Sequence, residues 1–158
     1  MEPDIISFGK KTQCCGIFAG KRLDEIENHV FNESSRINST FGGNLVDMVR
    51  FTIYLELIQK ENLINRASEN GDYLLSSLES LQENNTGLIS NARGKGLFCA
   101  FDLPDPEKRD QLVINMQEQG ALILGCGHKS IRFRPHLNIS RDEIDQAITM
   151  IEHSLSRL

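Results

Sequence analysis

Apolar positions divide the chain into a short strand-like beginning, a helical middle and a mixed final part. Two apolar runs, at residues 4–8 and 14–19, flank a polar turn with two adjacent lysines. Runs of this length bounded by turn residues are typical of buried strands. Because a two-stranded unit is only marginally stable alone, the pattern predicts that residues 1–45 do not fold as an independent domain.

A helical period begins at Leu45. Apolar residues then recur every three to four positions to about Glu61, and a second amphipathic stretch runs from residue 63 to about Asn84. The spacing predicts two consecutive helices with a break near Glu61 and Asn62.

From residue 87 onward the pattern predicts the order β-α-β-β-α. The expected strands span residues 96–103, 121–124 and 130–134, and the expected helices span residues 107–119 and the segment after Ser140. Ser140 followed by Glu143 is a capping-box pair, which marks a helix start. Residues 93–96, two of them glycines, are predicted to form a turn.

Composition and charge exclude several classes of function. The 158 residues are 39% hydrophobic and 25% charged, as in ordinary globular proteins, and the net charge is −5. An acidic chain offers no broad basic surface for nucleic acid, and no apolar run reaches the ~20 residues needed to cross a bilayer. The N-terminus lacks a signal-peptide pattern, so we expect a cytoplasmic protein without nucleic-acid or membrane partners. The cysteines show no metal-binding spacing, and no metal is expected.

Three residues are candidates for chemistry. Lys10 follows a strand and a glycine, where an amine can be held rigidly and form a Schiff base once deprotonated. Thr40 precedes a helix, and a hydroxyl beside free helix N–H groups suits a phosphate. Arg132 lies on a strand, shares a face with Arg134, and can bind a carboxylate through two hydrogen bonds. Each residue is also compatible with a plain reading, namely a solvated lysine, a helix cap and a solvent-facing arginine pair.

The order of these motifs resembles the class III (omega) pyridoxal-phosphate-dependent aminotransferases. Residues 3–10, Pro-Asp-Ile-Ile-Ser-Phe-Gly-Lys, resemble the cofactor-lysine signature of that family, and residues 38–44 resemble its phosphate-binding threonine loop. Residues 93–97 and 131–135 resemble its small-domain strand entry and its carboxylate-binding arginine strand. Within the family, the chain is most similar to members that act on the 6-amino group of L-lysine.

The resemblance implies a fold and an extent. We expect an α/β fold that is the C-terminal part of a fold-type-I pyridoxal-phosphate-dependent transferase. Residues 1–45 would be the end of the large cofactor-binding domain, and residues 46–158 would be a long linking helix and a small α+β domain. The glycine-rich phosphate loop, the ring-stacking aromatic and the aspartate facing the pyridine nitrogen have no counterpart here. The isolated chain is therefore expected to be an inactive fragment.

The resemblance also implies roles for the candidate residues. Lys10 would form the Schiff base with pyridoxal 5'-phosphate and move protons, with Lys11 as its competitor. Thr40 would bind the cofactor phosphate across a homodimer interface, and Arg132 would bind the substrate carboxylate. The expected reaction moves the 6-amino group of L-lysine to 2-oxoglutarate. A 4-aminobutyrate- or ornithine-type omega-aminotransferase, and a non-enzymatic binding module at residues 87–158, remain alternatives.

Overall fold

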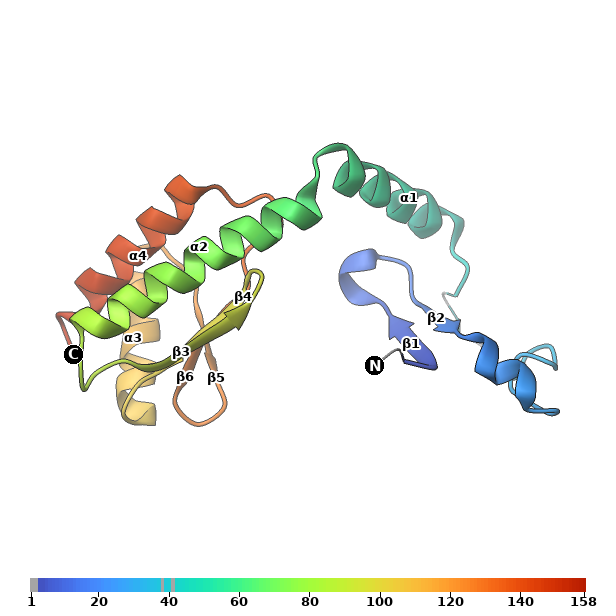
Figure 1. The fold of residues 1–158 in the computed structure, drawn as a ribbon, viewed down its shortest axis with the longest axis horizontal. Coiled ribbons are helices and arrows are strands. Elements are labelled where there is room, and N and C mark those ends of the chain that lie inside the picture. Colours follow the sequence, from blue (N-terminus) through green and yellow to red (C-terminus); the bar gives the residue numbers. More distant parts are fainter. Residues whose placement is uncertain (1–2, 38, 41) are drawn as a thin grey trace. The chain divides into compact units, whose positions relative to one another are not determined.

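The computed structural model describes residues 3–37, 39–40 and 42–158, and only the backbone of Lys11. Internal contacts divide the chain into two compact units, Met1–Glu61 and Asn62–Leu158 (Figure 1). Both units contain helices and strands, which confirms the predicted α/β class. The predicted domain boundary at residue 45 concerns the whole enzyme and stays a prediction.

A β-hairpin forms the start of the first unit. Strands β1 (Ile5–Phe8) and β2 (Gly16–Ala19) pair antiparallel, and their connection contains the short helix η1 (Lys10–Thr12). A second short helix, η2 (Lys21–Glu25), follows. The Phe8 ring lies opposite Gly16, where any side chain would overlap the ring. Phe8 stacks on Phe18 at 4.7 Å and on Phe51 of helix α1 (Leu45–Lys60) at 6.1 Å, which ties the hairpin to the helix.

The strands of this hairpin are not buried, contrary to the sequence prediction. Ile5 and Ile6 are 55% and 48% exposed, and Leu45 of α1 is 76% exposed. None of the described residues of the first unit is buried. The physical reason is that a two-stranded hairpin and one helix have too little surface to cover their own apolar side chains.

Helix α1 ends where the sequence predicted a break. Asn44 caps its start, with the side-chain oxygen accepting a hydrogen bond from the Val46 amide at 3.0 Å. Asn62 has a φ of 52°, in the left-handed region, so the chain cannot continue as one helix. Helix α2 (Leu63–Asn84) then begins the second unit.

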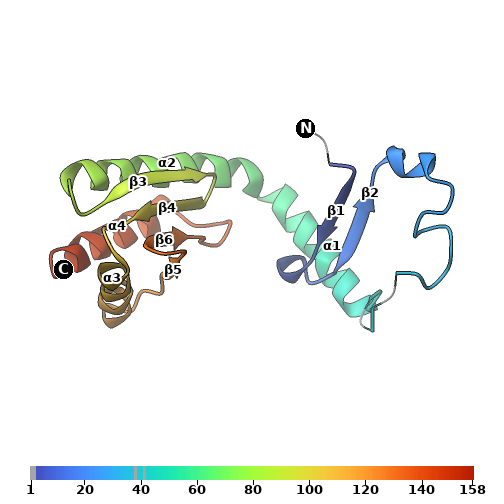
Figure 2. The same ribbon diagram turned by 90° about the horizontal axis from the view of Figure 1, so that it is seen from below.

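The second unit is a four-stranded antiparallel sheet with helices on one face. The sheet has the order β3 (Ser90–Lys95), β4 (Phe98–Asp102), β6 (Ser130–Phe133) and β5 (Leu124–Cys126). Helix α2 runs along β3 and β4, α3 (Pro106–Glu118) contacts β5, and α4 (Arg141–Leu155) packs on α2 and α3 (Figures 1 and 2). The largest fully buried apolar side chains come from all three helices, two strands and the residue after β4: Leu78, Leu81, Phe101, Leu103, Leu112, Met116, Ile131, Ile144 and Ile151.

Two details of the predicted strand order were wrong. Residues 90–95 form strand β3, whereas residues 93–96 were predicted to be a turn, so the observed order is β-β-α-β-β-α. Strand β5 spans Leu124–Cys126, later than the predicted residues 121–124. The capping box of α4 is confirmed, because Ser140 and Glu143 exchange side-chain-to-backbone hydrogen bonds of 2.8 and 3.3 Å.

Candidate functional site

Lys10 lies at the turn of the hairpin with an unusual backbone conformation. Its φ is 55°, in the left-handed region, and its side chain is exposed. The Lys10 carbonyl accepts a hydrogen bond from the Gln13 amide at 2.9 Å, which closes the turn. Left-handed conformations of non-glycine residues are costly, and they concentrate at functional sites. The turn therefore presents a primary amine from a restrained backbone.

Neighbouring contacts hold this turn from both sides. The Thr12 hydroxyl donates to the Cys14 carbonyl at 2.6 Å, and Arg50 of α1 donates to the Gln13 side chain at 2.9 Å. A Cβ on Gly9 would lie 3.0 Å from Cys15 Sγ, so the cysteine packs directly on the backbone before Lys10. These contacts hold the backbone of the turn from which the Lys10 side chain projects.

Thr40 lies in the same unit as Lys10, in an exposed turn before α1. Its neighbours Asn38 and Phe41, part of the predicted phosphate loop, lie outside the described residues. The Ser39 carbonyl accepts a hydrogen bond from the Gly42 amide at 3.1 Å. A hollow lined by the hairpin residues Phe8 and Cys15 also borders on Ser39, so this loop lies beside the Lys10 hairpin.

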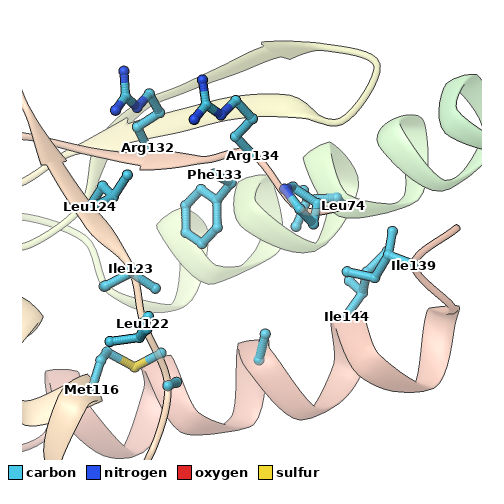
Figure 3. A pocket seen from close by; sticks show the side chains of 13 residues that line it. Leu74, Met116, Leu122, Ile123, Leu124, Arg132, Phe133, Arg134, Ile139 and Ile144 are labelled. Atoms are coloured by element: carbon cyan, nitrogen blue, oxygen red, sulfur yellow. The ribbon is translucent and has the colours of Figure 1, made fainter. Parts of the chain in front are cut away.

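Arg132 lies on β6 in the second unit, between Ala100 of β4 and Leu124 of β5. Its neighbours Ile131 and Phe133 are buried in the core, and Arg132 points to the opposite face of the sheet. Figure 3 shows Arg132 and Arg134 pointing the same way and Phe133 pointing the other way, as the strand alternation predicted. Arg132 Nε is shielded from solvent and has no hydrogen-bond partner among the described residues. This guanidinium can donate hydrogen bonds to the carboxylate of a bound small molecule.

The pocket in Figure 3 is lined by Arg132 and Arg134 and extends to the core side of the sheet. Leu74, Met116, Phe133, Ile139 and Ile144 are among its lining residues. The other walls are largely apolar, so the two arginines are the polar groups that this pocket offers among the described residues, and they suit an anion.

A polar cluster that sequence reasoning missed lies on the same face as Arg132. Asp102 accepts hydrogen bonds from Ser130 at 2.6 Å, from Arg93 at 2.9 Å and from Asn91 at 2.9 Å. Burial acts to raise the pKa of Asp102, but these three hydrogen bonds and the charge of Arg93 outweigh burial and lower the pKa. The cluster was missed because residues 93–96 were read as a turn. The sequence signal for this cluster is Arg93 itself. Once residues 90–95 are recognised as strand β3, Arg93 lies two strands away from Arg132 in the same sheet.

The lowered pKa predicts a pH-dependent contribution to stability. Asp102→Asn should lower the free energy of unfolding at pH 7 by about 1–2 kcal/mol, because Asp102 is only 13% exposed and its hydrogen bonds are charged. Because the pKa of Asp102 is lower in the folded than in the unfolded chain, its ionisation stabilises the folded chain at pH values above the ordinary aspartate pKa. This stabilisation is lost as pH falls through the folded-state pKa. Urea denaturation from pH 7 to about pH 3 should therefore show the difference between wild type and variant shrinking. A constant difference across this range would contradict the prediction.

Within the described residues, no helix is long and apolar enough to cross a membrane.

Comparison with known proteins decides the family. The model of the family "Aminotransferase class-III" matches residues 1–155. The chain belongs to the class III aminotransferases. It is 46% identical to the L-lysine-epsilon aminotransferase of Amycolatopsis lactamdurans over 157 residues, 99% of this chain and 35% of that protein. The predicted family is thereby confirmed.

A solved structure supports the same conclusion for the fold. Lysine aminotransferase from M. tuberculosis in the internal aldimine form superposes with a TM-score of 0.94 at 44% identity, covering 98% of this chain and 36% of that one. The 4-aminobutyrate aminotransferase of Dictyostelium discoideum is more distant, at 33% identity over 99% of this chain and 30% of that protein. The predicted fold-type-I transferase fold is confirmed, and the chain spans about a third of the length of these relatives.

The three predicted site residues fall in two units. Lys10 and Thr40 belong to the first unit and Arg132 belongs to the second. The predicted roles of all three, and the choice of Lys10 over Lys11, stay predictions. The side chain of Lys11 lies outside the part that the structure describes.

Proposed function

We propose that this class III aminotransferase chain belongs to an enzyme that moves the 6-amino group of L-lysine to 2-oxoglutarate. The observation that carries the proposal is the 46% identity to an L-lysine-epsilon aminotransferase, against 33% to a 4-aminobutyrate aminotransferase over nearly the same residues. The difference favours a lysine donor over 4-aminobutyrate. Because the chain spans 35% of that relative, the activity is proposed for the complete enzyme.

The described residues fit pyridoxal phosphate in the chemistry of their donors. Lys10 offers an exposed primary amine for the cofactor aldehyde, and Thr40 offers an exposed hydroxyl for its phosphate. When bound, the cofactor supplies an electron sink for the carbon that loses a proton. Lys10 and Thr40 are the residues of this chain that would hold it.

Lys10 has two tasks in this proposal. Its amine binds the cofactor while the substrate is absent, and afterwards it accepts a proton from the donor carbon and delivers it elsewhere. Both tasks use the lone pair of an amine nitrogen, which a lysine side chain can supply. The turn fixes the backbone from which the Lys10 side chain extends toward the cofactor.

Arg132 would select substrates by their carboxylates. A planar guanidinium binds a carboxylate through two parallel hydrogen bonds. L-Lysine held by its α-carboxylate presents its 6-amino group at the far end of the side chain. 2-Oxoglutarate also carries an α-carboxylate that Arg132 would bind. The proposed partners are these two small molecules, and we further propose a cytoplasmic homodimer. The exposed apolar side chains of the first unit, such as Leu45 at 76%, are surface for the rest of the complete enzyme and for a second subunit to cover.

A chimera tests this function directly. Residues 1–158 would replace the matching segment of the Amycolatopsis lactamdurans enzyme, and kcat/KM would be measured with L-lysine, L-ornithine and 4-aminobutyrate as donors to 2-oxoglutarate. We expect L-lysine to be preferred by about tenfold or more. The unaltered relative is the positive control, and the 158-residue chain alone should be inactive. Preference for 4-aminobutyrate or ornithine would contradict the lysine proposal, and a folded chimera without any transfer would favour a non-enzymatic module.

A further inference from the structure

The sheet of the second unit places one carboxylate between two arginines. Arg93 of β3 and Arg132 of β6 both lie opposite Ala100 of β4, one on each side of it. Asp102, two residues further along β4, lies opposite Ser130 and is a diagonal neighbour of both arginines. Diagonal neighbours across an antiparallel pair are about 7–8 Å apart, which long side chains can bridge. The register therefore gives Asp102 two possible cationic partners.

Among the described residues, Arg93 is the one cation that forms an ion pair with Asp102. Arg93 Nη1 lies 2.9 Å from Asp102 Oδ1, and Arg93 Nη2 donates to the Ser130 hydroxyl at 3.2 Å. Ser130 in turn donates to Asp102 Oδ1 at 2.6 Å. The other carboxylate oxygen, Oδ2, accepts from the Asn91 side chain at 2.9 Å. Both oxygens are thus engaged, by Arg93 and Asn91 of β3 and by Ser130 of β6.

The backbone of β3 contributes to this preference. The register of β3 and β4 shifts between Ser90 and Arg93, and Asn91 has a φ of 56°. Such a bulge re-aims the side chains next to it, and here Asn91 reaches the carboxylate. The Arg93 guanidinium also donates to the Asn91 carbonyl at 2.8 Å, which fixes its own orientation.

Arg132 has no comparable partner. Among the described residues no carboxylate lies within 4.0 Å of its guanidinium, and its shielded Nε atom lacks a hydrogen-bond partner. The two arginines share Ala100 as their opposite residue, but only the β3–β4 pair has a register shift, next to Arg93. Asn91 binds Asp102 from the bulge in β3, and the Ser130 hydroxyl, on β6, donates to Asp102 while it accepts from Arg93.

We propose that Arg93 is a positioning residue that keeps Asp102 away from Arg132, so that Arg132 stays free for a substrate carboxylate. The inference rests on the proposed function, and it adds a residue that acts on specificity without touching substrate. Without Arg93, Asp102 would be a largely buried carboxylate whose nearest cation on this face is Arg132. The two would then pair, and substrate would have to displace Asp102.

The first test follows Arg132 directly and needs no ligand. In the full 158-residue chain, the ¹⁵N NMR resonance of Arg132 Nε–H would be assigned with Arg132→Gln and compared in wild type, Arg93→Gln, Asp102→Asn and the double variant. We expect Asp102→Asn to shift this resonance in the Arg93→Gln background and to leave it nearly unchanged otherwise. Equal shifts in both backgrounds would overturn the proposal. Arg93→Lys keeps the cation but loses the fork of hydrogen bonds, so it should shift the resonance less than Arg93→Gln does, and the amide spectrum of each variant checks that it is folded.

The second test measures binding of glutarate, a dicarboxylate probe, to the same chains. Arg93→Gln should weaken glutarate binding about threefold, as expected for competition by a partly exposed ion pair, and the Arg93→Gln/Asp102→Asn double variant should restore it. Arg157→Gln, which breaks an exposed ion pair with Glu118 at 2.8 Å elsewhere in this unit, should have no effect. A double variant as weak as Arg93→Gln would show a merely structural role and overturn the proposal. If Arg132→Gln leaves glutarate binding unchanged, the proposed role of Arg132 fails, and the resonance comparison still decides the role of Arg93.

Discussion

Lys10→Arg should lower amino transfer by the chimeric enzyme by on the order of 10²- to 10⁴-fold, the usual contribution of a positioned proton-transfer group. Arginine keeps the positive charge and a long side chain, but its pKa is too high for it to lose a proton at neutral pH. It can therefore neither attack the cofactor aldehyde nor accept a proton from the substrate. The rate of the half-reaction with L-lysine, followed by the visible absorbance of the cofactor, is the measurement.

Lys11→Arg is the matched control, because the two lysines are adjacent in the same turn. If Lys10 is the reactive residue, the Lys11 variant should keep most of its activity and its cofactor absorbance. The reverse result, with loss of activity only in the Lys11 variant, would transfer the proposed role to Lys11. Equal loss in both variants would indicate that the turn itself had been disturbed.

The backbone at Lys10 gives a reason, independent of family, to expect function there. A non-glycine residue at a φ of 55° costs about 1 kcal/mol or more, and glycine would adopt this conformation freely. The chain has a glycine directly before this position, at Gly9, and a lysine at the strained position itself. The chain therefore has a lysine at a position whose backbone conformation alone would favour glycine.

The helices were predictable from sequence because their signals are local. The three-to-four spacing fixed α1 and α2 to within a residue or two, and the left-handed Asn62 lies at the predicted break. The pair Ser140 and Glu143 predicted the start of α4 through hydrogen bonds that involve only four consecutive residues. Periodicity and capping need no knowledge of distant parts of the chain.

Edge strands were less predictable because their signals depend on a partner. Strand β3, Ser90–Lys95, is at an edge of the sheet and has no alternation of apolar residues. Nothing in its own sequence shows that β4 will pair with it. The apolar residues 121–123 precede β5 and line the pocket under the sheet, although they were predicted to be part of the strand. Pairing with β6 decides where β5 begins.

Burial in the first unit was wrongly predicted for a related reason. Apolar runs such as residues 4–8 report that a segment has surface to cover, but they do not say what covers it. The hairpin and α1 supply too little surface, and Ile5 remains 55% exposed.

The candidate site shows the same division between local and distant signals. Strand alternation placed Arg132 and Arg134 on one face correctly, whereas their proposed function came from the order of motifs. The ion pair of Arg93 and Asp102 joins two strands through a bulge, and no spacing within either strand indicates it. Its effect on Arg132 becomes visible only when the cross-strand register is known.

Gly71→Ala should destabilise the second unit by about 3 kcal/mol, near the upper end for overpacking of a core. Gly71 is buried in α2, and the β3–β4 turn passes directly over it. A Cβ on Gly71 would overlap the carbonyl carbon, carbonyl oxygen and Cα of Gly96. These are backbone atoms, and Gly96 itself has a φ of 53°, so the turn has little freedom to move aside. Helix propensity alone favours alanine by about 1 kcal/mol, so the expected sign is opposite to that of an exposed helix.

Urea denaturation of the 158-residue chain measures this effect, because none of the described residues of the first unit is buried and the cooperative transition reports on the second. Ser76→Ala, at an exposed position of α2, is the control and should leave stability unchanged or slightly higher. Equal stability of Gly71→Ala and wild type would contradict the close approach of helix and turn.

If the fold instead survives by shifting the turn, β3 and β4 move with it, and these strands carry Arg93 and Asp102. In that case the shifted turn at Gly96 would disturb the ion pair of Arg93 and Asp102. The Arg132 resonance of a folded Gly71→Ala chain should then move in the same way as in Arg93→Gln.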